Sequence, residues 1–162
     1  MELQRKRNLV IGIGNEFRHD DSCGLYVANK LKNSGLPNTD VKTQSGESTA
    51  LIENWKGYST VYVVDAVLSP DEPGTIFRIN ATEQEIPKNL FKYSIHSFGI
   101  AEAVELGKMI SELPEKIFIY GIVLESFHDG RGLSSKVLKS SRKVIKSITE
   151  EISQLHHEYE II

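Results

Sequence analysis

The sequence predicts an α/β fold in which a mainly parallel sheet is covered by helices on both faces. Segments with the composition of β-strands alternate along the chain with segments of helical periodicity, the order expected of parallel strands joined by helices. The three strongest strand segments, 8–13, 60–64 and 116–123, are apolar throughout. Such continuous runs are typical of strands that are buried on both faces.

The first expected element is Asn8–Ile13, a short apolar run that ends in glycines, as a buried strand does. The second is a helix over Ser22–Lys32, where apolar residues recur at helical spacing. Asp20 or Asp21 is placed to cap the start of this helix. A weaker strand over Asp40–Gln44 and a short helix over Ala50–Trp55 follow.

Thr60–Val64 is rich in β-branched residues, is apolar on both faces and is expected to end at Asp65. A further strand, Gly74–Ile79, is introduced by Pro73, and residues 81–93 form a polar connection. Ser97–Lys108 is expected to be helical. One side of this helix is predicted to carry Ile100, Ala101, Val104 and Met109.

Lys116–Val123 is the third fully apolar strand. The last element is a long amphipathic helix over Ser134–His157. Its buried stripe is predicted to consist of Val137, Leu138, Ile145, Ile148, Ile152 and Leu155. The tail after about residue 156 is expected to fray, because chain ends without packing contacts lose order.

The composition is that of an ordinary globular chain. Its 162 residues, 40% hydrophobic and 25% charged, suffice for one domain spanning residues 1–162. The net charge is -3 and no basic stripe is present, so we expect neither nucleic acid nor a membrane as a partner. No segment approaches the roughly 20 apolar residues of a membrane span. Cys23 is the only cysteine, which excludes an internal disulfide and favours a reducing, cytoplasmic location.

Three chemical groups are expected to meet at one edge of the sheet. Asp20 and Asp21 follow the first strand. Asp65 ends the strand over 60–64, and His96 precedes a helix. Parallel sheets bind ligands beyond the carboxyl ends of their strands. Two carboxylates and one imidazole can bind a divalent metal ion. They leave coordination positions on the metal open for substrate or water.

Each of these groups also has a purely structural interpretation. One of Asp20 and Asp21 is expected to cap the following helix and to complement its dipole. An aspartate at a strand end often caps the next turn, and a lone histidine before a helix is often exposed. Taken together at one edge of one sheet, the three groups favour a site.

The turn Gly12-Ile13-Gly14-Asn15 begins like a dinucleotide-binding fingerprint, but Phe17 occupies the place of the third glycine. A nucleotide-binding α/β domain is therefore an alternative that the pattern disfavours, since the acidic residues would also repel phosphates. Cys23 lies near a helix start, and we expect it to pack as a small apolar group.

Five motifs in order along the chain resemble those of the hydrogenase maturation proteases, which trim the large subunit of nickel–iron hydrogenases. The motifs are Gly12-Ile13-Gly14-Asn15 with Asp20-Asp21 and Gly24, then Val63-Val64-Asp65-Ala66 followed by Pro73-Gly74-Thr75, then His96-Ser97-Phe98-Gly99, then Gly121-Ile122 through Glu125, and finally Gly132-Leu133-Ser134. The resemblance extends over nearly the whole chain.

The resemblance implies a three-layer fold with a twisted sheet of about five strands. It also implies an endopeptidase that removes the C-terminal extension of a nickel-loaded hydrogenase large-subunit precursor. By this resemblance, Asp21, Asp65 and His96 contact the metal and carry out catalysis. Nickel is the expected cofactor, and the substrate carries it. The metal would polarise the scissile carbonyl or activate water, or the carboxylates would orient that water. Asp20 would be a cap or a partner of these ligands, while Gly12, Gly14 and Asn15 shape the turn.

One element departs from the family pattern. Where many relatives have an Asp-Gly-Gly-Thr-like segment, this chain has Gln44-Ser45-Gly46-Glu47-Ser48, which leaves the hydrogenase subgroup open. The alternatives to a protease are a non-catalytic binding or chaperone module for the immature large subunit, a nucleotide-binding domain, and a metallohydrolase that keeps its own metal. We expect a monomer, which suits a protein that must dock on a larger one.

Overall fold

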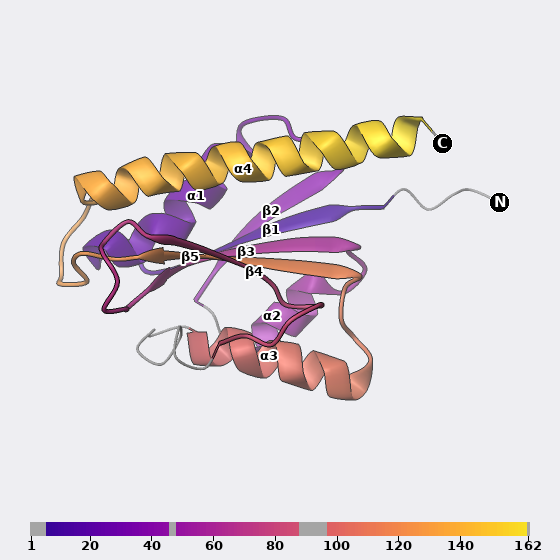
Figure 1. Cartoon of the computed structure of the whole chain (residues 1–162), viewed down its shortest axis with the longest axis horizontal. Coiled ribbons are helices and arrows are strands. Elements are labelled where there is room, and N and C mark those ends of the chain that lie inside the picture. The colour runs from indigo at the N-terminus through magenta and orange to yellow at the C-terminus, as the bar shows by residue number, and fades with distance from the viewer. Residues whose placement is uncertain (1–5, 46–47, 88–96, 162) are drawn as a thin grey trace.

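The computed structural model describes residues 6–45, 48–87 and 97–161; Figure 1 shows how their helices and strands are arranged. The strands are β1 (Asn8–Ile13), β2 (Thr39–Gln44), β3 (Thr60–Val67), β4 (Ile76–Asn80) and β5 (Lys116–Val123). The helices are η1, a single 3₁₀ turn (His19–Ser22), α1 (Cys23–Lys32), α2 (Ser48–Trp55), α3 (Ser97–Ile110) and α4 (Ser135–Glu160). In this described part of the chain, no helix combines the length and the apolar surface needed to cross a membrane.

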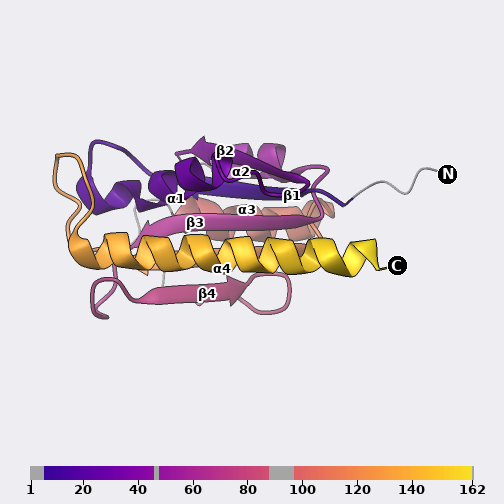
Figure 2. The ribbon, with the colours of Figure 1, turned by 90° about the horizontal axis from the view of Figure 1, so that it is seen from above.

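The five strands form one sheet in the order β2-β1-β3-β5-β4. All neighbouring pairs are parallel except β4–β5, which is antiparallel. The chain passes from β1 to β2 on one side and then to β3 on the other, so the direction of winding reverses between β1 and β3 (Figure 2). Open α/β sheets bind their ligands at the carboxyl ends of the strands at such a point.

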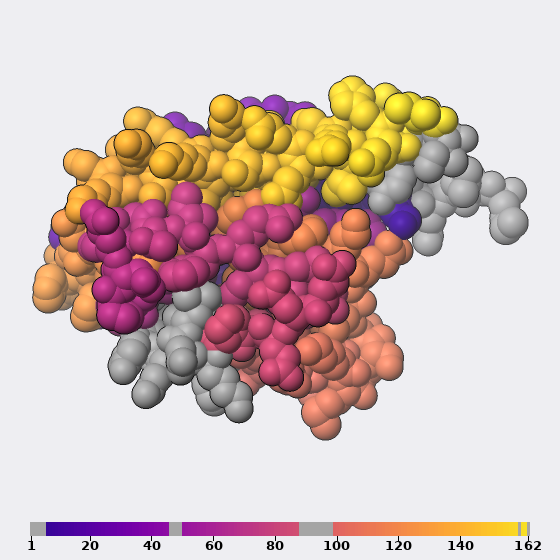
Figure 3. Space-filling view, viewed as in Figure 1, coloured from indigo at the N-terminus to yellow at the C-terminus, as the bar shows by residue number. Residues whose placement is uncertain are grey.

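Helices cover both faces of this sheet, which confirms the predicted three-layer α/β architecture. α1 and α4 lie on one face, and α2 and α3 lie on the other (Figure 1). β3 contributes alternate residues to the two cores: Tyr62 and Val64 to the first, Val61 and Val63 to the second. Burial on both faces explains why the central strands are apolar throughout. In the space-filling view, α4 extends along the molecule (Figure 3).

α3 runs antiparallel to the parallel strands. Just after its last residue, the backbone oxygen of Glu112 accepts a hydrogen bond from Trp55 Nε1 at 3.0 Å. The chain then enters β5, where the Lys116 nitrogen donates to the oxygen of Ser59, the residue before β3, at 3.1 Å. The C-terminal end of α3 therefore lies at the amino edge of the sheet, and its first turn lies at the carboxyl edge (Figure 1).

Several elements, β3 and α4 among them, are longer than the sequence predicts. β3 continues through Asp65 to Val67, so the prediction that the strand ends at Asp65 is wrong. Within the strand, Asp65 pairs with Gly121 of β5. α4 continues past Leu155 to Glu160. In this last turn, His156 Nε2 lies 3.2 Å from Glu160 Oε1.

The predicted apolar side of α3 is partly wrong. Ile100 and Val104 are buried as expected, but Met109 is 83% exposed and Ala103 is buried instead. The buried stripe follows positions 100, 103, 104 and 107, the spacing of one helix face. Met109 is two residues beyond this stripe, which turns its side chain away from the core.

Candidate functional site

Two of the three predicted metal ligands lie at the carboxyl edge between β1 and β3. Asp21 lies in η1, which follows β1 and packs against β3. Asp65 lies in β3, and both side chains are buried, with exposures of 2% and 0%. His96 lies outside the described residues, directly before α3. Among the residues that are described, no three His, Cys, Asp or Glu side chains are grouped so as to hold a metal ion.

Close packing of α1 against the sheet brings Asp21 and Asp65 together. Gly24, in the first turn of α1, lies so close to the carbonyl oxygens of Ile13 and Val64 that any Cβ would clash with both. Gly14, in the turn after β1, faces the carbonyl oxygen of Asp21 in the same way. Glycine at these two positions lets η1 and α1 approach the strand ends, which places Asp21 beside the part of β3 that carries Asp65.

The charges of three carboxylates act on one buried thiol at this edge. The pKa of Cys23 is raised well above its usual value, first by complete burial and then by the negative charges of Asp65, Asp20 and Asp21. Cys23 is fully buried in the apolar core beneath α1, as predicted. A thiol held in its protonated form is a poor nucleophile, whereas the same negative field favours a bound cation.

Asp20 joins η1 to the loop after β5. Its Oδ2 atom accepts hydrogen bonds from the backbone nitrogens of Glu125 at 2.9 Å and Ser126 at 3.0 Å. Ser134 donates to the same carboxylate twice, from its nitrogen at 2.7 Å and from its hydroxyl at 2.9 Å. With 0% exposure, Asp20 is an anchor between two distant segments.

Of the two roles expected of Asp20, a cap of the following helix or a partner of the metal ligands, the first is wrong. The N-cap of α1 is Ser22, which makes no side-chain capping bond in the described structure. Sequence analysis also missed the partners of Asp20, because they lie 105 to 114 positions further along the chain. The one available signal was Ser134, a serine directly before a helix, which is a typical N-cap position.

A pocket of about 410 Å³ lies beside the turn after β1. Its lining includes Gly14, Asn15 and Phe17 from this turn, and Gln44 from the end of β2. The Gln44 amide oxygen accepts a hydrogen bond from Asn54 at 2.5 Å. Its Nε2 is buried and has no acceptor in the described part of the chain.

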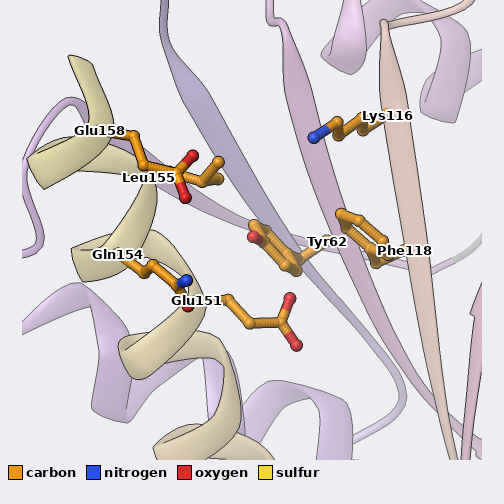
Figure 4. A pocket seen from close by; sticks show the side chains of 7 residues that line it. All are labelled: Tyr62, Lys116, Phe118, Glu151, Gln154, Leu155 and Glu158. Carbon is orange, nitrogen blue, oxygen red and sulfur yellow. The ribbon is translucent and has the colours of Figure 1, made fainter.

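A smaller pocket, of about 210 Å³, lies at the opposite edge of the sheet, between the last turns of α4 and the first residues of β3 and β5 (Figure 4). Next to it, Glu151 accepts hydrogen bonds from the Tyr120 hydroxyl at 2.5 Å and from Arg78 at 3.0 and 3.2 Å. This network belongs to the amino edge and is no part of the candidate site.

Comparison with known proteins gives one consistent family. Residues 25–151 match the sequence profile described as hydrogenase maturation protease. A protein of Methanocaldococcus jannaschii with a provisional assignment as a hydrogenase maturation protease is 31% identical, over 94% of this chain and 100% of its own length. The hydrogenase 2 maturation protease of Escherichia coli is 26% identical over 81% of each chain.

Solved structures have the same fold. The hydrogenase-maturating endopeptidase HybD of Escherichia coli superposes with a TM-score of 0.73 at 21% identity, covering 91% of this chain and 93% of that one. A second Escherichia coli endopeptidase, solved in solution, gives a TM-score of 0.79 at 23% identity, covering 88% and 89%. The profile match extends over most of the chain, and the Methanocaldococcus relative is matched along its full length. The chain therefore belongs to the hydrogenase maturation proteases, a family of endopeptidases.

Proposed function

We propose that this protein removes a C-terminal extension from the precursor of a hydrogenase large subunit once nickel has been inserted into that precursor. The observation that carries the proposal is the burial of two aspartates, Asp21 in η1 and Asp65 in β3, where the winding of this sheet reverses and η1 packs against β3. Membership of the family indicates the class of reaction. The two carboxylates give a reason why a nickel-loaded substrate is preferred.

In this proposal the nickel belongs to the substrate. Asp21 and Asp65 offer carboxylate oxygens to it, and their negative charges, which add to the effect of burial in raising the pKa of Cys23, also favour a bound cation. His96, the residue before α3, adds an imidazole, and carboxylate and imidazole ligands both suit nickel. A precursor without nickel brings no cation to these acids, so recognition depends on metal loading.

Hydrolysis at this site needs no nucleophilic side chain. The oxygen of a water molecule adds to the scissile carbonyl carbon, the carbon–nitrogen bond breaks, and the released amine takes up a proton. Asp21 or Asp65 takes the proton from the water and returns it to the amine as general base and then general acid.

The test is the intact mass of a large-subunit precursor from the same organism, nickel-loaded or nickel-free, after incubation with the protein. We expect a C-terminal fragment to be lost from the nickel-loaded form alone. Nickel-dependent binding without a change of mass would identify a non-catalytic module instead. Cleavage of both forms would contradict the dependence on nickel.

A further inference from the structure

We infer that Phe17 and Arg131 form a docking surface for the folded body of the precursor, at the entrance to the candidate site. The inference rests on the proposed function, because it names where the same substrate is held. Phe17 is 54% exposed, and the guanidinium carbon of Arg131 lies 4.9 Å from the centre of its ring. Aromatic and arginine side chains contribute most of the binding energy at many protein interfaces.

The two loops that carry these residues are joined by backbone hydrogen bonds. The Gly130 nitrogen donates to the Phe17 oxygen at 2.8 Å, and the His19 nitrogen donates to the Gly130 oxygen at 2.9 Å. Arg18 Nε donates to the Phe127 oxygen at 3.2 Å. The exposed ring of Phe17 is therefore presented from a backbone that is already ordered, and binding has less conformational freedom to remove.

The position of Phe17 connects this surface to the aspartates. It lies four residues before Asp21 and lines the pocket beside the turn after β1. A second pocket, of about 320 Å³, lies on the other side of Glu16 and is lined in part by Leu25, Leu133 and Leu138. In this inference the extension of the precursor approaches Asp21 from the side of these two pockets, and the folded body of the precursor covers Phe17 and the second, leucine-lined pocket.

The charge of the surface indicates what the partner presents. Arg131 is exposed and makes no ion pair with any described residue, although Asp129 is two residues before it and Glu16 is the neighbour of Phe17. The surface therefore suits an apolar patch on the precursor with a carboxylate at its border. The carboxylate would meet the guanidinium, and the apolar patch would meet the ring.

The test measures the Kd of the nickel-loaded precursor for immobilised protein, with intact mass followed in parallel. Phe17→Ala is expected to raise the Kd about tenfold, as truncation of a central aromatic contact does, and Arg131→Ala to raise it roughly threefold. Phe17→Tyr keeps the ring and should restore wild-type binding. Met109→Ala is the matched control, because it truncates an exposed apolar side chain near the end of α3, at the amino edge of the sheet.

The outcomes separate this inference from the proposed function. If Phe17→Ala binds like wild type while the precursor is still processed, the docking surface is wrong and the proposed function stands. If the precursor binds in a Phe17-dependent way but its mass never changes, the docking surface stands and the protease proposal fails. If wild-type protein neither binds nor cuts the precursor, both are overturned.

Discussion

The carboxylate of Asp20 accepts hydrogen bonds from both the backbone nitrogen and the hydroxyl of Ser134. Asp20 lies in η1, and Ser134 is the N-cap of α4. One buried acid thus ties the turn after β1 to the start of the last helix. Because Asp21 is the next residue, the position of a proposed metal-contacting side chain depends on this anchor.

Asp20→Asn should destabilise the protein and reduce processing. An amide has only one acceptor oxygen, so at least one of the donors from Glu125, Ser126 and Ser134 would be left buried without a partner. Such a loss costs about 1–3 kcal/mol, which urea denaturation would detect. Asp129→Asn, which changes an exposed acid in the same loop, should leave the unfolding midpoint unchanged; an equal effect of both substitutions would refute the anchoring role.

Gly24→Ala should prevent α1 from packing against the strand ends. The added Cβ would clash with the backbone oxygens of Ile13 and Val64, which cannot move independently of the sheet. We expect a loss of at least about 3 kcal/mol, the upper end for overpacked sites, or no folded protein. In the control Gly107→Ala, the new Cβ meets side chains and no backbone: Leu113 Cδ2 at 2.7 Å and Cγ at 3.3 Å, and Trp55 Cζ2 at 3.5 Å. The tightest of these contacts is with the end of the flexible Leu113 side chain, which can turn away. Thermal unfolding of the two variants should therefore differ clearly.

Cys23→Ala should retain the processing activity of the wild type within about twofold, because a buried thiol held protonated takes no part in hydrolysis. In the native protein, Cys23 should also resist a thiol reagent and should react once urea exposes it. The reaction can be followed by the absorbance of the released chromophore. Loss of processing in a folded Cys23→Ala protein would point to a covalent mechanism and contradict this account.

Tyr120 should make stability depend on pH in the alkaline range. Burial, and then the hydrogen bond to Glu151 and its charge, raise the pKa of Tyr120 to about 12. Because this lies above the unfolded pKa of about 10, the stabilising contribution is complete below pH 10 and is lost as the pH rises toward 12. The urea concentration at the unfolding midpoint should therefore fall between pH 8 and pH 11. This fall should be smaller in Tyr120→Phe than in wild type. Tyr26→Phe serves as the tyrosine-removal control.

The sequence predicts the central strands well because local composition determines them. β1 and β5 have the bounds expected from their apolar runs, Asn8–Ile13 and Lys116–Val123. β3 extends beyond its apolar run, where Asp65 pairs with Gly121 and Val67 with Val123. That pairing brings together residues far apart in the chain, and no local pattern reports it.

Prediction of the candidate site is limited in the same way, because local patterns do not report contacts between distant residues. Strand ends and topology rules are enough to predict that Asp21 and Asp65 lie at one edge, since both follow from the alternation of strands and helices. The role of Asp20 could not be predicted, because capping rules consider only neighbouring residues and its partners come from the loop before α4. The exposed ring of Phe17 and its contact with Arg131 depend on the same pairing of distant loops.

The central claim is that Asp21 and Asp65 carry out the processing of a nickel-loaded precursor. The most direct measurement is the rate at which Asp65→Asn and Asp21→Asn shorten that precursor, followed by intact mass, with the exposed acid variant Asp71→Asn as control. We expect both site variants to fold but to be slower than wild type by at least about a hundredfold, the lower bound for removing a general base, while Asp71→Asn keeps the wild-type rate. A folded Asp21→Asn or Asp65→Asn protein that processes the precursor at the wild-type rate would contradict the account.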